Sequence, residues 1–397
     1  MPASPRTARA INDRLALRLL QSEGPLTAGQ LKELTGLSRP TVADLVDRLT
    51  AQGLIEVVGE AGSRRRGPNA KLHGIVTGLA HLAALDVRTE GVTLAVADLV
   101  GTVLAEASVP VDAEDSTGAA VERAVALVER TAEEAGAAPL HTVAIGAPGL
   151  IDPVTGELRD SSGLPEWHRR LVAALHERLP ARVLVENETN LAALAEQRDG
   201  AARDRDTFAL LWLGHGIGAA VVLDGVLRRG ASGGTGEIGF LPVPGTAGLP
   251  SATDCDGGFH SLAGSAAVTE LARAHGLVAP PVAPGEPAAA ALVRDAVTAD
   301  AGTPAARFLD ALAGRLVLGA ASVVAVLDPG CLVLAGEVGR AGGDRLAGLV
   351  AARLSAMSPL PTEVRPTALG GGAVLRGALL MARDGAQEDL FAPTDTL

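Results

Sequence analysis

The stretch TAGQLKELTGLSRPTVADLVDRLTAQGL, residues 27–54, has the pattern of two short helices separated by a tight turn. Thr27 is a favourable N-cap residue and Gln30 follows three positions later, so the pair predicts a capping box at the start of the first helix. Leu31 and Leu34 lie at helical spacing and are expected to point inward. The stretch therefore begins with a short helix that packs through one face.

A glycine and a second cap separate this helix from the next one. Gly36 is expected to end the first helix, and Ser38 to cap the second. Pro40 falls in the first turn, where a missing N–H is tolerated. The spacing i, i+3, i+4, i+7 then predicts a buried stripe made by Val42, Leu45, Val46 and Leu49. Two helices joined in this way form a helix-turn-helix.

The opposite face of the second helix is polar. In a helix-turn-helix the N-terminal part of that helix faces base edges in the major groove, so Arg39 and Thr41 are the leading contacts. Asp44 could accept a hydrogen bond from a cytosine amino group, but a role in orienting Arg48, four residues later, is favoured. The candidate DNA contacts on this helix are Ser38, Arg39, Pro40, Thr41, Asp44 and Arg48.

A β-hairpin is expected directly after the helices. Residues 54–58 and 70–73 have the pattern of two strands, joined by the sequence GEAGSRRRGPN. Such a wing can lay cations along a DNA backbone or into a minor groove. A solvated charged loop is the alternative, but the position directly after a helix-turn-helix favours DNA binding. The candidate contacts of the wing are Arg64, Arg65, Arg66 and Lys71.

Charge separates the first part of the chain from the rest. Residues 1–80 hold 11 Lys or Arg against 7 Asp or Glu, a balance of +4 in a chain of net charge −12, so the remainder carries −16. One end is thus suited to phosphates, and polyanion binding by the remainder is disfavoured. The length of 397 residues exceeds one ordinary core. The expected units are a winged helix-turn-helix (1–78), a first lobe (79–187), a second lobe (188–370) and a C-terminal helix with its tail that packs back on the body (371–397).

Several classes of protein are disfavoured by the composition. No run approaches the about 18 apolar residues of a membrane helix. The start MPASPRTARAINDRL lacks the apolar stretch of a secretory signal. Two cysteines 76 residues apart make neither a disulfide framework nor a paired metal motif. The expected location is the cytoplasm of a bacterium, with no membrane partner.

From His81 the pattern changes to alternating strands. LAALDV and VTLAVADLVGTVLAEASV precede a helix expected over about 116–135 and a further strand, TVAIGAPG. The stretch FALLWLGHGIGAAVVLDGVLRRG has the pattern of the opening strand and hairpin of another such unit. This internal repeat predicts an α/β body of two lobes around a cleft.

Five blocks of the body, GAPGLIDPVTGEL, VENETNLAALAE, LGHGIGAAVVLDGVLRRG, GEIG and LDPGCLVLAGEVG, resemble successive signatures of the ROK (repressor, open reading frame, kinase) family. That family comprises sugar kinases, and repressors in which a winged helix-turn-helix is added to the same body. The resemblance covers essentially the whole chain. It implies a two-lobed actin-like or hexokinase-like (ribonuclease H-like) fold behind the winged head.

Two positions that the resemblance assigns to phosphoryl transfer are altered. The phosphate loop of the kinases reads Asp-x-Gly-x-Thr, usually with a second Gly between, whereas this chain has Asp86-Val87-Arg88-Thr89-Glu90, without the glycines whose N–H groups would approach a phosphate. The catalytic Asp aligns with Glu188, whose additional methylene displaces the carboxylate. We expect no kinase activity and no nucleotide cofactor.

The zinc module of the resemblance is also incomplete. Phe240 stands at its His, and only Cys255 remains of its cysteine run, so no metal is expected. Phe240 and Ser261 also align with two lost sugar contacts. Asn187, Glu188 and Glu237 remain to bind hydroxyls, although Asn187 could instead stabilise its loop and the carboxylates could be solvated. Trp167 could cover the sugar or pack in the core. The candidate ligand-binding residues are Gly149, Asn187, Glu188, Glu237, Phe240 and Ser261.

The resemblance and the altered positions together imply a DNA-binding transcriptional regulator, favoured as a repressor. We expect a homodimer, or a tetramer formed by two dimers, bound to an inverted-repeat operator, with a body that senses a sugar or a related small molecule. A ligand-independent DNA-binding dimer is the first alternative. An active sugar kinase is the least favoured one.

Overall fold

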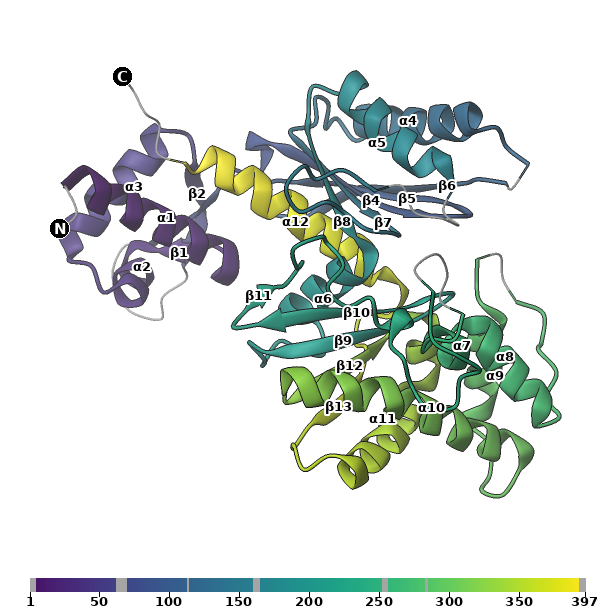
Figure 1. The fold of residues 1–397 in the computed structure, drawn as a ribbon. Helices are drawn as coiled ribbons and strands as arrows, with labels where there is room; N and C mark the ends of the chain where they lie inside the picture. The colour runs from purple at the N-terminus through teal and green to yellow at the C-terminus, as the bar shows by residue number, and fades with distance from the viewer. Residues whose placement is uncertain are drawn as a thin grey trace.

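The computed structural model has an N-terminal head and a two-lobed α/β body (Figure 1). It describes residues 5–61, 70–112, 114–159, 165–251, 256–282 and 285–392. The wing arginines at 64–66 and the cysteine at 255 lie outside the described residues, so the predictions made for them are not tested by the fold.

The head contains three helices and a three-stranded antiparallel sheet in the order β1-β3-β2. Its elements are α1 (Pro5–Glu23), β1 (Leu26–Thr27), α2 (Ala28–Thr35), α3 (Arg39–Ala51), β2 (Ile55–Ala61) and β3 (Ala70–Ile75). The capping box is present, since the N of Gln30 donates to Oγ1 of Thr27 at 3.2 Å and the N of Thr27 donates to Oε1 of Gln30 at 2.9 Å. Gly36 ends α2 with φ 69°, and Ser38 caps α3. The helix-turn-helix prediction is confirmed.

One inward-facing residue of the head was predicted wrongly. Leu31 is buried as expected, but Leu34 is 51% exposed. The reason is that α2 is only 8 residues long and buries a single position. The predicted stripe of α3 is buried in full, and α1 packs beside it through Ala16, Leu17 and Leu20.

The first lobe is a five-stranded sheet in the order β6-β5-β4-β7-β8. Its elements are η1 (Thr77–Leu79), β4 (His81–Arg88), β5 (Gly91–Asp98), β6 (Val103–Pro110), α4 (Thr117–Glu134), β7 (Thr142–Ala147), α5 (Glu166–Arg178) and β8 (Arg182–Asn187). The helices α4 and α5 cover one face of the sheet (Figure 1). Trp167 of α5 is 5% exposed and belongs to the core of this lobe. Of the two roles considered for it, covering a sugar or packing in the core, the structure supports core packing.

The second lobe repeats the plan, with strand order β11-β10-β9-β12-β13. Its elements are β9 (Phe208–Leu213), β10 (Ile217–Leu223), β11 (Val226–Leu227), η2 (Ile238–Phe240), α7 (His260–Ala263), α8 (Ser265–Ala274), α9 (Ala288–Ala296), α10 (Pro304–Leu327), β12 (Cys331–Ala335), α11 (Gly336–Met357) and β13 (Glu363–Pro366). β9 pairs antiparallel with β10 and parallel with β12, as β4 does with β5 and β7. The internal repeat is therefore confirmed.

The helix α10 is long and apolar enough to cross a membrane by length and composition, the one such helix in the described part of the chain. Half of its most apolar stretch is buried inside the second lobe, where Phe308, Leu312 and Leu316 are almost fully covered. Its apolar character is explained by its place in this core.

Two further helices, α6 (Glu188–Asp199) and α12 (Ala373–Leu390), pack together and connect the lobes. The turn η3 (Gly370–Gly372) leads from the second lobe into α12, which then crosses the face of the first sheet opposite α4 and α5 (Figure 1). The two helices approach so closely that a Cβ at Gly377 of α12 would lie 2.0 Å from the backbone O of Leu191 in α6. Only glycine fits this contact without a shift of the backbone.

We expect Gly377→Ala to destabilise the body by about 1–3 kcal/mol, because the added methyl group separates α12 from α6. Gly348→Ala is the matched control, since Gly348 lies in α11 with no atom within 4 Å of the added Cβ. There alanine should stabilise by about 0.5–1 kcal/mol. Denaturant unfolding followed by the fluorescence of the two tryptophans, both in the body, measures each effect. Equal effects of the two substitutions would refute the packing argument.

Candidate functional site

The exposed face of α3 holds the side chains predicted to contact DNA. Ser38 Oγ accepts from the N of Thr41 at 3.3 Å and lies 2.8 Å from Thr41 Oγ1, so the cap orients the threonine hydroxyl at the helix start. Pro40 is exposed and pre-sets the first turn. Arg39 is exposed and makes no hydrogen bond or ion pair with the described residues. Its guanidinium is therefore available to a partner.

Arg48 is held by carboxylates from two helices. Its Nη1 contacts Asp44 Oδ2 at 2.6 Å, which confirms the favoured role of Asp44. Its Nε and Nη2 also donate to the two carboxylate oxygens of Asp13 in α1, at 3.0 and 2.5 Å. These carboxylates, Asp13 first, raise the pKa of Arg48. The guanidinium thus joins α3 to α1, and a DNA contact would have to compete with two ion pairs.

On the wing, Lys71 is exposed in β3 and pairs in register with Glu60 of β2. The structure therefore gathers Ser38, Arg39, Pro40, Thr41 and Asp44 at one end of α3, and it places Lys71 on the neighbouring hairpin.

The cleft between the lobes contains a cavity of about 130 Å³. Gly149, Asn187, Glu188 and Glu237 line it, so four of the six predicted ligand residues come together. Phe240 and Ser261 are not among the residues that line this cavity, so the cavity does not bring them together with the other four. Phe240 follows the cleft in η2, and the Ser261 hydroxyl donates to the O of Gly258 at 2.7 Å.

Sequence reasoning missed the remaining polar wall of this cavity, which Thr189, Asn190, Trp212 and Thr235 form. Thr189 and Asn190 lie in the first turn of α6, within the ROK-like block VENETNLAALAE. Trp212 and Thr235 belong to no such block. No Lys or Arg lines the cavity among the described residues. The cavity therefore offers carboxylates, amides and hydroxyls to a ligand.

Asn187 has a structural role at the start of α6. Its Oδ1 accepts from the N of Thr189 at 2.8 Å and from the N of Asn190 at 3.4 Å. Its Nδ2 donates to the O of Gly149 at 2.9 Å. The proposal that Asn187 stabilises its loop is confirmed, and one amide hydrogen remains for a ligand.

Arg88 lies in the turn that aligns with the phosphate loop of the resemblance, where its side chain lines a cavity of about 320 Å³. Its Nη1 donates to Oε1 of Glu337 in the second lobe at 2.6 Å, and its Nε donates to Oδ2 of Asp86 at 3.1 Å. The other oxygen of Asp86 is buried without a partner. A guanidinium held by carboxylates from both lobes thus lies where the resemblance would place phosphates. The sequence showed the loss of glycines here but not this contact, whose partners are 249 residues apart.

The cleft is electrostatically acidic. Burial raises the pKa of Glu188 to about 8, and the nearby carboxylate of Asp86 adds to the effect. Burial also raises the pKa of Asp86, which Arg88 partly offsets, and the pKa of Glu237. Adding an anion to this group of carboxylates would cost further electrostatic energy. The arrangement favours a neutral or cationic ligand.

The chain thus joins a winged helix-turn-helix to a two-lobed, kinase-like α/β body. Family models give the same division: residues 82–385 match the ROK family and residues 11–66 match the MarR family. The chain belongs to the ROK family.

Named relatives are consistent with this assignment. The chain is 27% identical over 243 residues to the DNA-binding transcriptional dual regulator NagC of Escherichia coli (strain K12), covering 59% of this chain and 58% of that protein. It is 25% identical over 239 residues to the xylose repressor of Bacillus subtilis (strain 168), covering 59% and 61%. The chain thus spans about 60% of the length of these curated relatives.

Solved structures agree on the fold. A ROK family transcriptional regulator, described as a homolog of the E. coli MLC protein, superposes with a TM-score of 0.76 at 20% identity and covers 97% of this chain and 98% of its own. The ROK hexokinase of Thermus thermophilus gives 0.60 at 27% identity, covering 77% and 99%. The expected winged head and actin-like or hexokinase-like body are therefore confirmed.

The raised pKa of Glu188 predicts how stability depends on pH. In the folded chain Glu188 keeps its proton up to about pH 8, whereas in the unfolded chain it loses the proton near pH 4.5. The free energy of unfolding is therefore undiminished by this group below pH 4.5 and falls as the pH rises from 4.5 toward 8. Relative to Glu188→Gln, the wild type should lose at most about 1.4 kcal/mol per pH unit in this window.

Denaturant unfolding at several pH values measures this difference. Glu177→Gln, on the exposed side of α5, is the control and should follow the wild type. Parallel stability curves for wild type and Glu188→Gln would contradict the assignment.

Proposed function

We propose that this chain is a transcriptional repressor that binds DNA through its winged head and senses a neutral sugar, or a closely related polyol, in its body without phosphorylating it. The observation that carries the proposal is the pairing of a free, exposed Arg39 at the start of α3 with a phosphate turn whose own arginine, Arg88, is held by two carboxylates. One site offers a cation to DNA, and in the other the guanidinium of Arg88 is already paired with Asp86 and Glu337.

The geometry of the head supports DNA binding. The first turn of α3 is fixed by the Ser38 cap, so Arg39 and Thr41 are presented on a rigid element. A bidentate arginine contact with guanine contributes about 1–3 kcal/mol of discrimination. Two heads in a homodimer would match half-sites about 34 Å apart in an inverted repeat.

The geometry of the cleft argues against phosphoryl transfer. Phosphoryl transfer depends on positioning and on cations or N–H groups around the moving phosphate. Here the guanidinium of Arg88 is already paired with Asp86 and Glu337, so it is not free to neutralise a moving phosphate. The body is therefore proposed as a sensor and not as an enzyme.

The carboxylates and amides of the cleft suit vicinal hydroxyls. Ligand binding between the lobes would change their relative position, and so the spacing of the two heads of a dimer. The chain would act in the cytoplasm, where its operator is. The second candidate, a dimer that ignores ligands, is favoured only by the absence of Phe240 and Ser261 from the lining of the cavity.

Arg39→Ala should weaken binding to the preferred duplex by about 1–3 kcal/mol and relax specificity chiefly at one base pair. The duplex is first recovered by selection from a random pool, and binding is then measured by fluorescence anisotropy. Arg130→Ala removes the same charge from the exposed side of α4 and should leave affinity unchanged. An unchanged operator profile in Arg39→Ala would exclude Arg39 as a base contact.

A neutral sugar that binds only the native chain, present at a concentration of about 100 times its Kd, should raise the free energy of unfolding by about 2.7 kcal/mol. A thermal-shift panel of free monosaccharides and their phosphate esters measures this, with Glu237→Gln expected to reduce the shift. The phosphate esters should give smaller shifts because the cavity lacks a cation. Sugar-dependent consumption of ATP would overturn the sensor proposal, and a panel without any shift would favour the ligand-independent dimer.

A further inference from the structure

The helix α12 joins the interlobe cleft to the head. At its start, Gly370, Gly371 and Ala373 line a cavity of about 320 Å³ that Arg88 and Glu337 also line. At its other end it lies against α1 of the head (Figure 1). An α-helix rises 1.5 Å per residue, so these 18 residues span about 27 Å. One continuous element therefore runs from the region between the lobes to α1 of the head.

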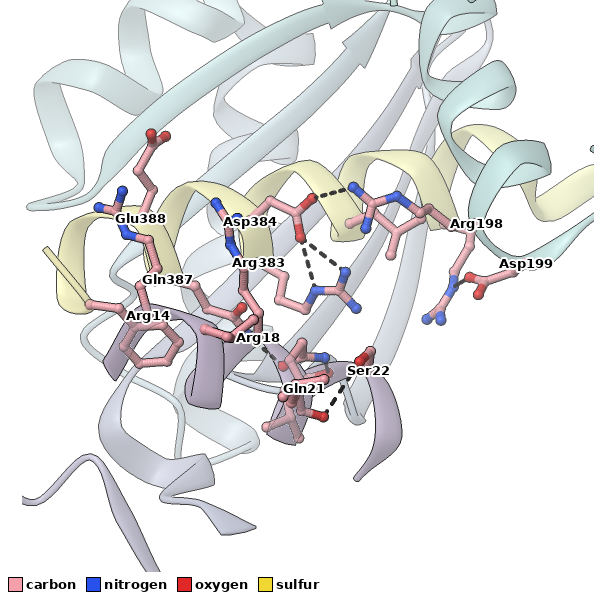
Figure 2. A pocket seen from close by; sticks show the side chains of 16 residues that line it. Arg14, Arg18, Gln21, Ser22, Arg198, Asp199, Arg383, Asp384, Gln387 and Glu388 are labelled. Atoms are coloured by element: carbon pink, nitrogen blue, oxygen red, sulfur yellow. Dashed lines mark hydrogen bonds and ion pairs between the residues drawn. The ribbon is translucent and has the colours of Figure 1, made fainter. Parts of the chain in front are cut away.

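Two glutamines make the contact between α12 and the head. The Nε2 of Gln387 donates to Oε1 of Gln21 at 2.6 Å and to the backbone O of Leu99 at 3.1 Å. The Nε2 of Gln21 donates to the backbone O of Val100 at 3.3 Å. We call Gln21 and Gln387 the glutamine joint (Figure 2). Its hydrogen bonds connect α1 of the head, α12 and the turn after β5.

The helix α6 runs from the same cleft toward the same joint. It begins with Glu188 in the cavity, and at its end Arg198 contacts Asp384 of α12 at 3.3 Å, while Asp199 contacts Arg376 of α12 at 2.7 Å (Figure 2). The close glycine contact described above holds α12 against α6 along its first turns. A shift of either helix at the cleft must therefore move the other.

Beside the joint, an open groove of about 840 Å³ separates α1 from α12. Leu15 of α1 lines it and is 39% exposed. Arg14 and Arg18 extend from α1 toward α12 in Figure 2, yet they form no ion pair with the described residues. Beside the groove, one hydrophobic core contains Leu17 and Leu20 of α1 together with Leu379 and Ala386 of α12. The head and α12 are therefore joined through packed apolar residues as well as through the glutamine joint.

We propose that α12 relays the position of the lobes to the head, and that Gln387 is the positioning residue that transmits it through Gln21. The inference rests on the proposed function, because it assigns a route for the regulation of the same head by the same cleft. A movement of the second lobe that breaks or makes the Arg88–Glu337 contact displaces η3 and the start of α12. The C-terminal end of α12 then displaces α1 through the hydrogen bond of Gln387 with Gln21.

The proposed coupling between the interlobe contact and α1 can be measured without identifying the ligand. Coupling between two sites typically changes an equilibrium by about 5–150-fold. Glu337→Gln weakens the interlobe contact, and its effect should reach α1 only while the glutamine joint is intact. A double-mutant cycle isolates this dependence, because it removes the separate effect of each change.

The test is hydrogen exchange of the α1 backbone amides in the full chain, for wild type, Glu337→Gln, Gln387→Ala and the double variant. We expect Glu337→Gln to change exchange in the second half of α1 by about 5-fold or more, and to change it less than about 2-fold when Gln387→Ala is present. If Glu337→Gln does not fold, Arg88→Lys serves as the perturbation of the cleft. The pair Gln21→Glu with Gln387→Lys restores a contact between α1 and α12 and should restore the coupling.

Asp389→Ala is the matched control, since Asp389 lies in the same last turns of α12 but contacts Arg182 of β8 and not the head. The effect of Glu337→Gln on α1 should survive this change. The relay is refuted if the cleft variant leaves α1 unchanged, or if it changes α1 equally with and without Gln387. Failure of the proposed function appears separately, as a wild-type chain that selects no duplex.

Discussion

The ion pair of Arg88 with Glu337 across the cleft is the contact on which the account of the body depends. It places a neutralised guanidinium in the turn where a kinase of this fold holds phosphates, and it links the first lobe to the second without a nucleotide. Because Asp86 remains buried with one unpartnered oxygen, loss of Arg88 would leave an uncompensated carboxylate. The contact of Arg88 with Glu337 therefore joins the two lobes at the turn that aligns with the phosphate loop.

The remaining architecture follows from how the lobes are connected to the head. The helices α6 and α12 begin at the cleft and pack tightly against each other, and α12 ends beside α1. In the head, the bond of Arg48 with Asp13 joins α3 to α1, and the glutamine joint joins α1 to α12. These contacts form the route by which we propose that a change in the cleft reaches α3.

Local sequence patterns predicted much of this fold, but they could not predict contacts between residues that are far apart in the chain. The capping box of Thr27 and the αL turn at Gly36 depend on residues within one or two turns, so they were predictable. Leu34 was not, because its exposure depends on where the short α2 meets the core. Motif resemblance placed Glu188 and Glu237 in one cavity, but Glu337, which pairs with Arg88, and Gln21, which pairs with Gln387, lie hundreds of residues away and carry no local pattern.

One titration tests the central claim that the chain has kept a DNA-binding output and lost nucleotide chemistry. A fluorescent duplex recovered by selection is titrated with the full chain alone, with a neutral sugar panel, and with Mg²⁺ and ATP. The account predicts saturable binding at two chains per duplex, which a sugar changes and Mg²⁺ with ATP does not. Absence of saturable binding, or a response to ATP in place of the sugars, would contradict it.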